Sequence, residues 1–193
     1  MHGRGANELD LEPLLGLLDP RARLLGIVPR GPLTLPPGGA HWYVVQQVGY
    51  PDSNTFLTTF ERASIWLDTV LAEAGVPPER AVLGGFSQGA VMSYALGLAA
   101  SRPKPAAILG MSGFIPRVEG FEVDLASRAG LPVSIAHGTN DPIISIQWGR
   151  DARDRLTRAG LDVRYQEDPV DHTIAPAALT QARETLEEAL PPV

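Results

Sequence analysis

The segment 85–89, with the sequence Gly-Phe-Ser-Gln-Gly, places a serine between two glycines. It follows the apolar run 80–84 and opens a helix-like stretch at 90–100. Between a strand and a helix, this pattern is typical of a tight turn that exposes a nucleophilic serine at the end of a sheet. Glycine has no Cβ, so both flanking positions allow the close backbone approach that such a turn needs. The pattern favours Ser87 as a nucleophile over an ordinary glycine-rich turn.

Two later residues could complete a catalytic triad with Ser87. Asp141 follows the apolar run 132–136, and His172 follows the run 161–165. The order Ser, Asp, His is the one expected of an α/β-hydrolase. His172 would accept the serine proton and pass it to the leaving group, while Asp141 would orient and stabilise the imidazole. Each residue could instead have a role outside catalysis: Asp141 could be a turn aspartate before Pro142, and His172 could be a surface histidine. His137 ends the predicted strand that precedes Asp141, just before a glycine turn, and is expected to have a structural role.

A histidine- and glycine-rich segment at the start of the chain suggests a site for the negative charge of the reaction. Its sequence is His-Gly-Arg-Gly, at positions 2–5. Turns of this kind supply a backbone N–H to an oxyanion hole, and the residue after the nucleophile supplies the second. We therefore expect the N–H groups of Arg4 and Gln88 to be the two donors.

Apolar runs that suit strands alternate with stretches of helical periodicity along the chain. The predicted strands are 24–28, 80–84, 106–111, 132–136 and 161–165. The predicted helices are 56–74 with Asn54 as a cap, 90–100, 148–159 and 176–190. This rhythm predicts a mostly parallel, doubly wound α/β sheet with helices on both faces. We expect one domain over residues 1–193, with loops at 33–41 and at 114–130, the latter with room for a short helix.

The composition narrows the classes of function. Of 193 residues, 44% are hydrophobic and 20% are charged, and the net charge is −6, which argues against nucleic acid as a partner. There is no cysteine, so disulfides, thiolate metal sites and a cysteine nucleophile are excluded. No histidine and carboxylate set has metal-ligand spacing, so we expect no metal. We expect no stable membrane insertion, and a cytoplasmic location is the default.

With these residues assembled, the chain resembles the phospholipase/carboxylesterase family of α/β-hydrolases, which includes bacterial carboxylesterases and acyl-protein thioesterases. The resemblance implies an esterase or thioesterase without cofactor or metal. Its substrate would be a small to medium acyl ester, with lysophospholipids and acyl thioesters in the same class, and a homodimer is left open. The matching pieces are His2-Gly3-Arg4-Gly5, Pro29-Arg30-Gly31-Pro32, Gly85-Phe86-Ser87-Gln88-Gly89, Met111-Ser112-Gly113, His137-Gly138-Thr139-Asn140-Asp141-Pro142 and His172.

The chain departs from the family pattern at two places. Asp171 stands where the family usually has glycine, and this carboxylate could raise the pKa of His172 or compete with Asp141 for it. The family also places an apolar strand directly before its HGxG turn, whereas only Met1 precedes His2 here. We expect an N-terminal strand to be missing from this sequence, with the true start upstream of Met1. A rearranged sheet, or a strand borrowed from a partner, would also account for the difference.

Two functions besides that of a carboxylesterase stay open. The first is a catalytically impaired protein of the same fold that binds a ligand or partner, suggested by the missing strand and by Asp171. The second is a dienelactone hydrolase-like enzyme, against which the absence of cysteine weighs. For the carboxylesterase, we expect an open acyl groove with apolar walls contributed by Leu35, Ile143, Ile144 and Trp148.

Overall fold

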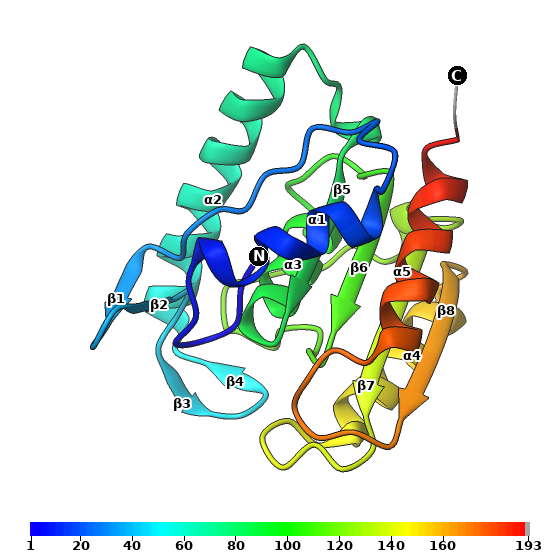
Figure 1. Cartoon of the computed structure of the whole chain (residues 1–193). Helices are drawn as coiled ribbons and strands as arrows, with labels where there is room; N and C mark the ends of the chain where they lie inside the picture. The colour runs from blue at the N-terminus through cyan, green and yellow to red at the C-terminus, as the bar shows by residue number, and fades with distance from the viewer. Residues whose placement is uncertain (192–193) are drawn as a thin grey trace.

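The computed structural model describes residues 1–191, and a parallel four-stranded sheet forms its centre (Figure 1). The spatial order is β5-β6-β7-β8, the same as the chain order. The register pairs Leu83 with Ile108, Ile108 with Val133, and Ile135 with Tyr165. The strands confirm four of the five predicted ones, with bounds shifted by up to three residues: β5 (Val82–Phe86), β6 (Ala107–Met111), β7 (Pro132–Gly138) and β8 (Asp162–Asp168).

Helices cover both faces of this sheet, as predicted for a doubly wound fold. On one face, α3 (Gln88–Leu98) and α4 (Ile146–Arg158) pack on Ile108, Val133 and Ile135. On the other face, α5 (Pro176–Ala189) and α1 (Glu12–Leu18) lie against Leu109 and Val82. The two central strands, β6 and β7, are therefore buried on both sides, which explains their near-continuous apolar sequences. The edge strand β8 has no fully buried residue and carries charged side chains.

The segment between α1 and β5 contains one long helix and two small hairpins. The helix is α2 (Ser53–Ala74), which confirms the predicted apolar periodicity. The first hairpin forms where the proline- and glycine-rich composition of residues 33–41 had predicted only loop, and the second lies in the stretch 45–51, for which no element was predicted. They pair β1 (Leu33–Leu35) with β2 (Gly39–His41), and β3 (Val45–Gln47) with β4 (Tyr50–Pro51). Short 3-10 helices occur at Glu8–Asp10, Pro78–Arg80 and Ala126–Arg128, the last inside the predicted loop 114–130.

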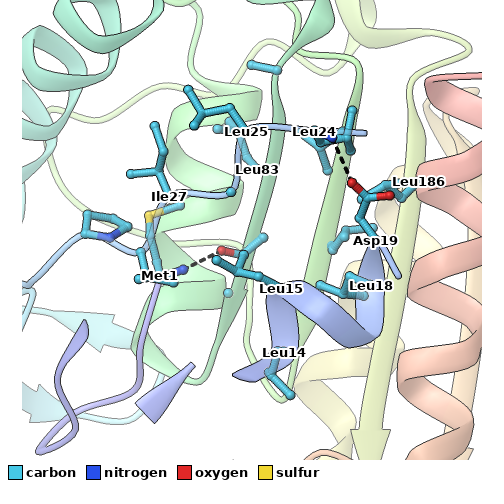
Figure 2. Close-up of a pocket in the computed structure, with 18 of the residues that line it drawn as sticks. Met1, Leu14, Leu15, Leu18, Asp19, Leu24, Leu25, Ile27, Leu83 and Leu186 are labelled. Carbon is cyan, nitrogen blue, oxygen red and sulfur yellow. Dashed lines mark hydrogen bonds between the residues drawn. The ribbon is translucent and has the colours of Figure 1, made fainter. Parts of the chain in front are cut away.

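The prediction of a strand at 24–28 is wrong. These residues have no regular secondary structure and form no part of the sheet. The N–H of Leu24 donates to the Asp19 carboxylate at 2.7 Å instead of to a strand, and Leu25 is 71% exposed. The segment is apolar because one of its sides, including Leu24, packs against the α5 side of the core. The apolar composition of the segment therefore reflects packing against the core (Figure 2), which does not require the segment to be a strand.

None of the helices in the described part of the chain combines the length and apolar character needed to cross a membrane.

The start of α2 provides a test of the fold. Asp52, not the predicted Asn54, is the N-cap, and its carboxylate accepts a hydrogen bond from the N–H of Thr55 at 2.9 Å. Asp52→Ala should therefore lower the free energy of unfolding by about 1 kcal/mol, measured by urea denaturation. Asn54→Ala is the matched control and should change it by less than about half of that amount. A larger effect at Asn54 than at Asp52 would contradict the assignment of the cap.

Candidate active site

Ser87 lies on a sharp turn between the end of β5 and the start of α3. Its backbone has φ 55° and ψ −121°, in a region that residues with a Cβ seldom adopt. The turn is held because the N–H of Ser87 donates to the carbonyl of Met111 on β6 at 2.9 Å. A Cβ on Gly85 would come within 2.3 Å of the Gly89 backbone, so glycine is required for this approach. The turn thus has the geometry predicted from the sequence.

A continuous chain of hydrogen bonds joins Ser87, His172 and Asp141. The Oγ of Ser87 lies 2.9 Å from Nε2 of His172, and Nδ1 of His172 lies 2.6 Å from Oδ2 of Asp141. The ring of Phe86 packs on the imidazole, with centroids 4.7 Å apart. The three side chains come from loops that follow β5, β7 and β8, which end at the same edge of the sheet. The residues predicted to form a triad are therefore adjacent in space.

The Asp141 carboxylate is well supplied with hydrogen-bond donors. Burial by itself would raise the pKa of Asp141, but the hydrogen bond from His172 and the N–H groups of Ile144 and Ile143 outweigh it. Those two N–H groups each donate to Oδ1 at 2.8 Å. The pKa of Asp141 lies below the ordinary value, so this carboxylate is ionised at neutral pH and can accept a hydrogen bond from Nδ1–H of His172.

His137, at the end of β7, is a buried neighbour of this carboxylate. Burial lowers its pKa, which keeps the imidazole neutral at neutral pH. Its Nε2 lies 2.8 Å from the carbonyl oxygen of Ile144 and 3.5 Å from Oδ2 of Asp141. A neutral imidazole with its proton on Nε2 donates to that carbonyl and so ties the Asp141 loop to the end of β7.

Asp171 does not compete with Asp141 for the histidine. The structure pairs Nδ1 of His172 with Asp141, whereas Asp171 is exposed and only its backbone carbonyl makes a hydrogen bond, to the N–H of Thr173 at 2.8 Å. Both ring nitrogens of His172 are thus paired with other residues, Asp141 and Ser87.

The His-Gly-Arg-Gly turn lies directly beside Ser87. A Cβ built on Gly3 would be 3.3 Å from the Cβ of Ser87. The turn is fixed by His2, whose Nε2 accepts a hydrogen bond from the N–H of Gly31 at 2.9 Å. Within the described residues, the N–H groups of Arg4 and Gln88 donate no hydrogen bond. Both predicted oxyanion donors are therefore free for a ligand.

The Gln88 side chain has a role that the sequence analysis missed. It is buried at the start of α3, where it accepts a hydrogen bond from the N–H of Trp42 at 3.0 Å and donates to the carbonyl of Tyr43 at 2.9 Å. The indole N–H of Trp42 in turn donates to the carbonyl of His2 at 2.8 Å. A polar amide side chain at the start of an otherwise apolar helix could have indicated a buried hydrogen-bond network. The sequence does not show its partners, because they are distant in the chain.

A cavity of about 340 Å³ opens at Ser87 and His172. Its other walls come from the first fourteen residues, from Phe86 and from the segment after His172, with Leu11, Leu14 and Ile174 as apolar members. None of the predicted wall residues lines it. Leu35 lies in β1, Ile143 is 57% exposed, Ile144 is buried in the core, and Trp148 packs on Phe114. Their contact with a substrate stays a prediction. Among residues 1–191, no three His, Asp or Glu side chains are grouped as metal ligands would be.

Comparison with known proteins identifies the family. The model of the Phospholipase/Carboxylesterase family matches residues 1–190. The chain belongs to this family. That membership confirms the predicted resemblance and the predicted enzyme class, a carboxylic ester hydrolase. Acyl-protein thioesterase 1 of Debaryomyces hansenii is 26% identical over 179 residues, which cover 89% of this chain and 75% of that protein. Acyl-protein thioesterase 1 of Gibberella zeae is 34% identical over 125 residues, covering 62% of this chain and 52% of that protein.

Solved structures agree with this assignment. The carboxylesterase of Bacillus cereus superposes with a TM-score of 0.83 at 27% sequence identity, covering 98% of this chain and 86% of that chain. The carboxylesterase of Mesorhizobium loti, at 21% identity and a TM-score of 0.82, shows the same fold. Together with the parallel sheet and its two layers of helices, these similarities confirm the predicted α/β-hydrolase fold.

The Gln88 hydrogen bonds give a prediction for stability. Gln88→Met keeps the size of the side chain but leaves the Trp42 N–H and the Tyr43 carbonyl without their partner. Buried polar groups that lose a partner cost about 1–3 kcal/mol, so the free energy of unfolding should fall by that amount in urea denaturation. Gln147→Met, at an exposed position on α4, is the control and should be nearly neutral. Equal effects at both positions would show that the network contributes nothing specific.

Proposed function

We propose that this protein is a serine carboxylesterase that cleaves ester or thioester bonds through an acyl-enzyme intermediate. The observation that carries the proposal is the hydrogen-bonded chain from Ser87 through His172 to Asp141. An ionised carboxylate on Nδ1 fixes the tautomer in which Nε2 accepts the proton of Ser87. The serine oxygen is then available to attack an acyl carbonyl in the cavity beside it.

The remaining groups of the site suit the charge that such an attack develops. The carbonyl oxygen becomes an oxyanion as the serine adds, and free backbone N–H groups stabilise it. We assign this role to the N–H groups of Arg4, in the His-Gly-Arg-Gly turn beside Ser87, and of Gln88, the first residue of α3. The protonated His172 then donates its proton to the leaving alcohol or thiol, which leaves the acyl group on Ser87. In the second half of the reaction, a water molecule gives a proton to His172 and attacks the acyl carbonyl. His172 returns the proton to the serine oxygen as the acid leaves.

The cavity at Ser87 suits a small to medium acyl group. Its volume of about 340 Å³ lies at the small end of ligand pockets, and Leu11, Leu14, Phe86 and Ile174 give it apolar walls. The relatives named acyl-protein thioesterase make a thioester a natural second substrate class. We propose a small-molecule ester or thioester as the partner of the site, and the cytoplasmic location and the homodimer stay predictions.

Replacing the nucleophile tests the proposal. Ser87→Ala should reduce the hydrolysis of p-nitrophenyl acetate and butyrate by at least about 1,000-fold, because no acyl-enzyme can form. Ser127→Ala, on an exposed 3-10 helix, should keep wild-type kcat/KM. Turnover that survives in folded Ser87→Ala, checked by circular dichroism, would rule out this mechanism.

Replacing each of the two acidic side chains near His172 separates their roles. Asp141→Asn should lower kcat by about 10³–10⁴-fold, because an amide favours the wrong imidazole tautomer. Asp171→Asn is the matched control and should change kcat by less than about twofold, since its side chain is exposed. The wild-type carboxyl of Asp141 has a lowered pKa, so it stays ionised as the pH falls from 8 to about 5 and is protonated only below that range. Equal losses in the two variants would contradict the assignment of Asp141.

A further inference from the structure

The carboxylate of Asp141 has two imidazoles as neighbours, and only one of them belongs to the hydrogen-bonded chain that reaches Ser87. Its Oδ2 is 2.6 Å from Nδ1 of His172 and 3.5 Å from Nε2 of His137. The side chains of Asp141 and His137 are both fully buried. His137 therefore adjoins the acidic residue of the site at the same oxygen that His172 uses.

The loop 141–144 and His137 form a closed set of contacts. The N–H of Ile144 donates to Oδ1 of Asp141 at 2.8 Å, and the carbonyl oxygen of the same residue lies 2.8 Å from Nε2 of His137. Ile144 is itself buried in the core, so its backbone is a fixed point of this set. A shift of the imidazole would therefore be passed on to the carboxylate of Asp141.

Only one protonation state of His137 suits these contacts. Its Nδ1 is buried and has no hydrogen-bond partner among residues 1–191. In the neutral ring, a proton on Nδ1 would leave a buried N–H unpaired and would turn the lone pair of Nε2 toward the carbonyl oxygen of Ile144. Burial lowers the pKa of His137, so the doubly protonated ring is disfavoured as well. The proton therefore stays on Nε2, beside the carboxylate of Asp141.

Gly149 of α4 leaves the space that the imidazole occupies. A Cβ built on Gly149 would lie 2.8 Å from Nδ1 and 3.2 Å from Cβ of His137. Real Cβ atoms essentially never approach another atom as closely as 2.8 Å, so a larger residue at this position must displace the ring or the helix. The backbone of His137 is held separately, by its pairing with Glu167 of β8. The ring is thus confined between α4 and the loop of Asp141.

We propose that His137 is a positioning residue for the reaction of Ser87. Its Nε2–H, held toward the Ile144 carbonyl, keeps Oδ2 of Asp141 directed at His172. The sequence predicted a structural role, in which the ring would matter only for its volume. In the positioning role the N–H matters too, because the positive end of its dipole lies beside a buried carboxylate in a medium of low dielectric constant. This inference rests on the function proposed above.

Two substitutions of His137 separate the N–H from the volume of the ring. His137→Phe keeps an aromatic ring without the N–H, and it should lower kcat for p-nitrophenyl butyrate by about 10–100-fold while KM changes by less than about threefold. His137→Gln places an amide N–H near the position of Nε2 and should recover kcat to within about fivefold of wild type. Wild-type kcat in His137→Phe, or an equal loss in His137→Gln, would overturn the proposal.

Gly149→Ala tests the same ring from the side of α4 and leaves His137 in place. The added methyl group should displace the imidazole, and kcat should fall by at least about fivefold. Gly16→Ala is the matched control: it is also a helical glycine, but a Cβ there meets no neighbouring atom within 4 Å, so kcat should stay at the wild-type value. If circular dichroism shows that His137→Phe does not fold, Gly149→Ala decides, and an unchanged kcat overturns the proposal.

Proton NMR adds a readout that requires no turnover. The proton in the 2.6 Å hydrogen bond between His172 and Asp141 should resonate far downfield of the backbone amides. This resonance should shift in folded His137→Phe and in Gly149→Ala, and it should return toward its wild-type position in His137→Gln. A resonance that is unchanged in all three variants would overturn the proposal. Because this measurement needs no ester hydrolysis, its result is distinguishable from a failure of the function proposed for Ser87.

Discussion

The strained backbone of Ser87 is the constraint on which the site depends. A residue with a Cβ at φ 55° costs about 1–3 kcal/mol and persists only where its surroundings fix it. Three things fix it here: β5 ends on one side, α3 begins on the other, and the N–H of Ser87 is bonded to Met111. The strained turn places the side chain where it can react. The hydroxyl stands at the end of the sheet beside His172, and the first N–H of α3 is left free next to it.

The site is assembled from segments that are far apart in the chain, and buried polar contacts hold them together. Gln88 bonds to the backbone at Trp42 and Tyr43, and Trp42 bonds to His2, so the first turn of α3 is connected to the His-Gly-Arg-Gly turn. At the other end of the triad, His137 and two backbone amides hold the Asp141 loop. The same turn is tied to β5 through Met1, whose amino group donates to the carbonyl of Gly84.

The sequence predicted the parts of this arrangement that are governed by local pattern. Short buried strands, the amphipathic α2, the serine turn and the order Ser87, Asp141, His172 could all be recognised, because apolar runs and glycine positions reflect local geometry. Prediction from the sequence failed where contacts between residues distant in the chain determine the structure. The apolar run 24–28 lies against the core without joining the sheet, the hairpins at 33–51 have strands too short to leave a pattern, and Asp52 caps α2 in place of Asn54. The Gln88 network was missed because its partners are more than forty residues away.

With His172 and Asp141 beside it, Ser87 should be a stronger nucleophile than any other serine of the chain. Labelling with a fluorophosphonate, followed by peptide mass spectrometry, measures this directly, because the reagent reacts with activated serines and needs no knowledge of the substrate. We expect one adduct per chain, on Ser87, whose rate of formation falls steeply when His172 is replaced by alanine. An unlabelled Ser87 in the folded protein, or labelling that is unaffected by the loss of His172, would contradict it.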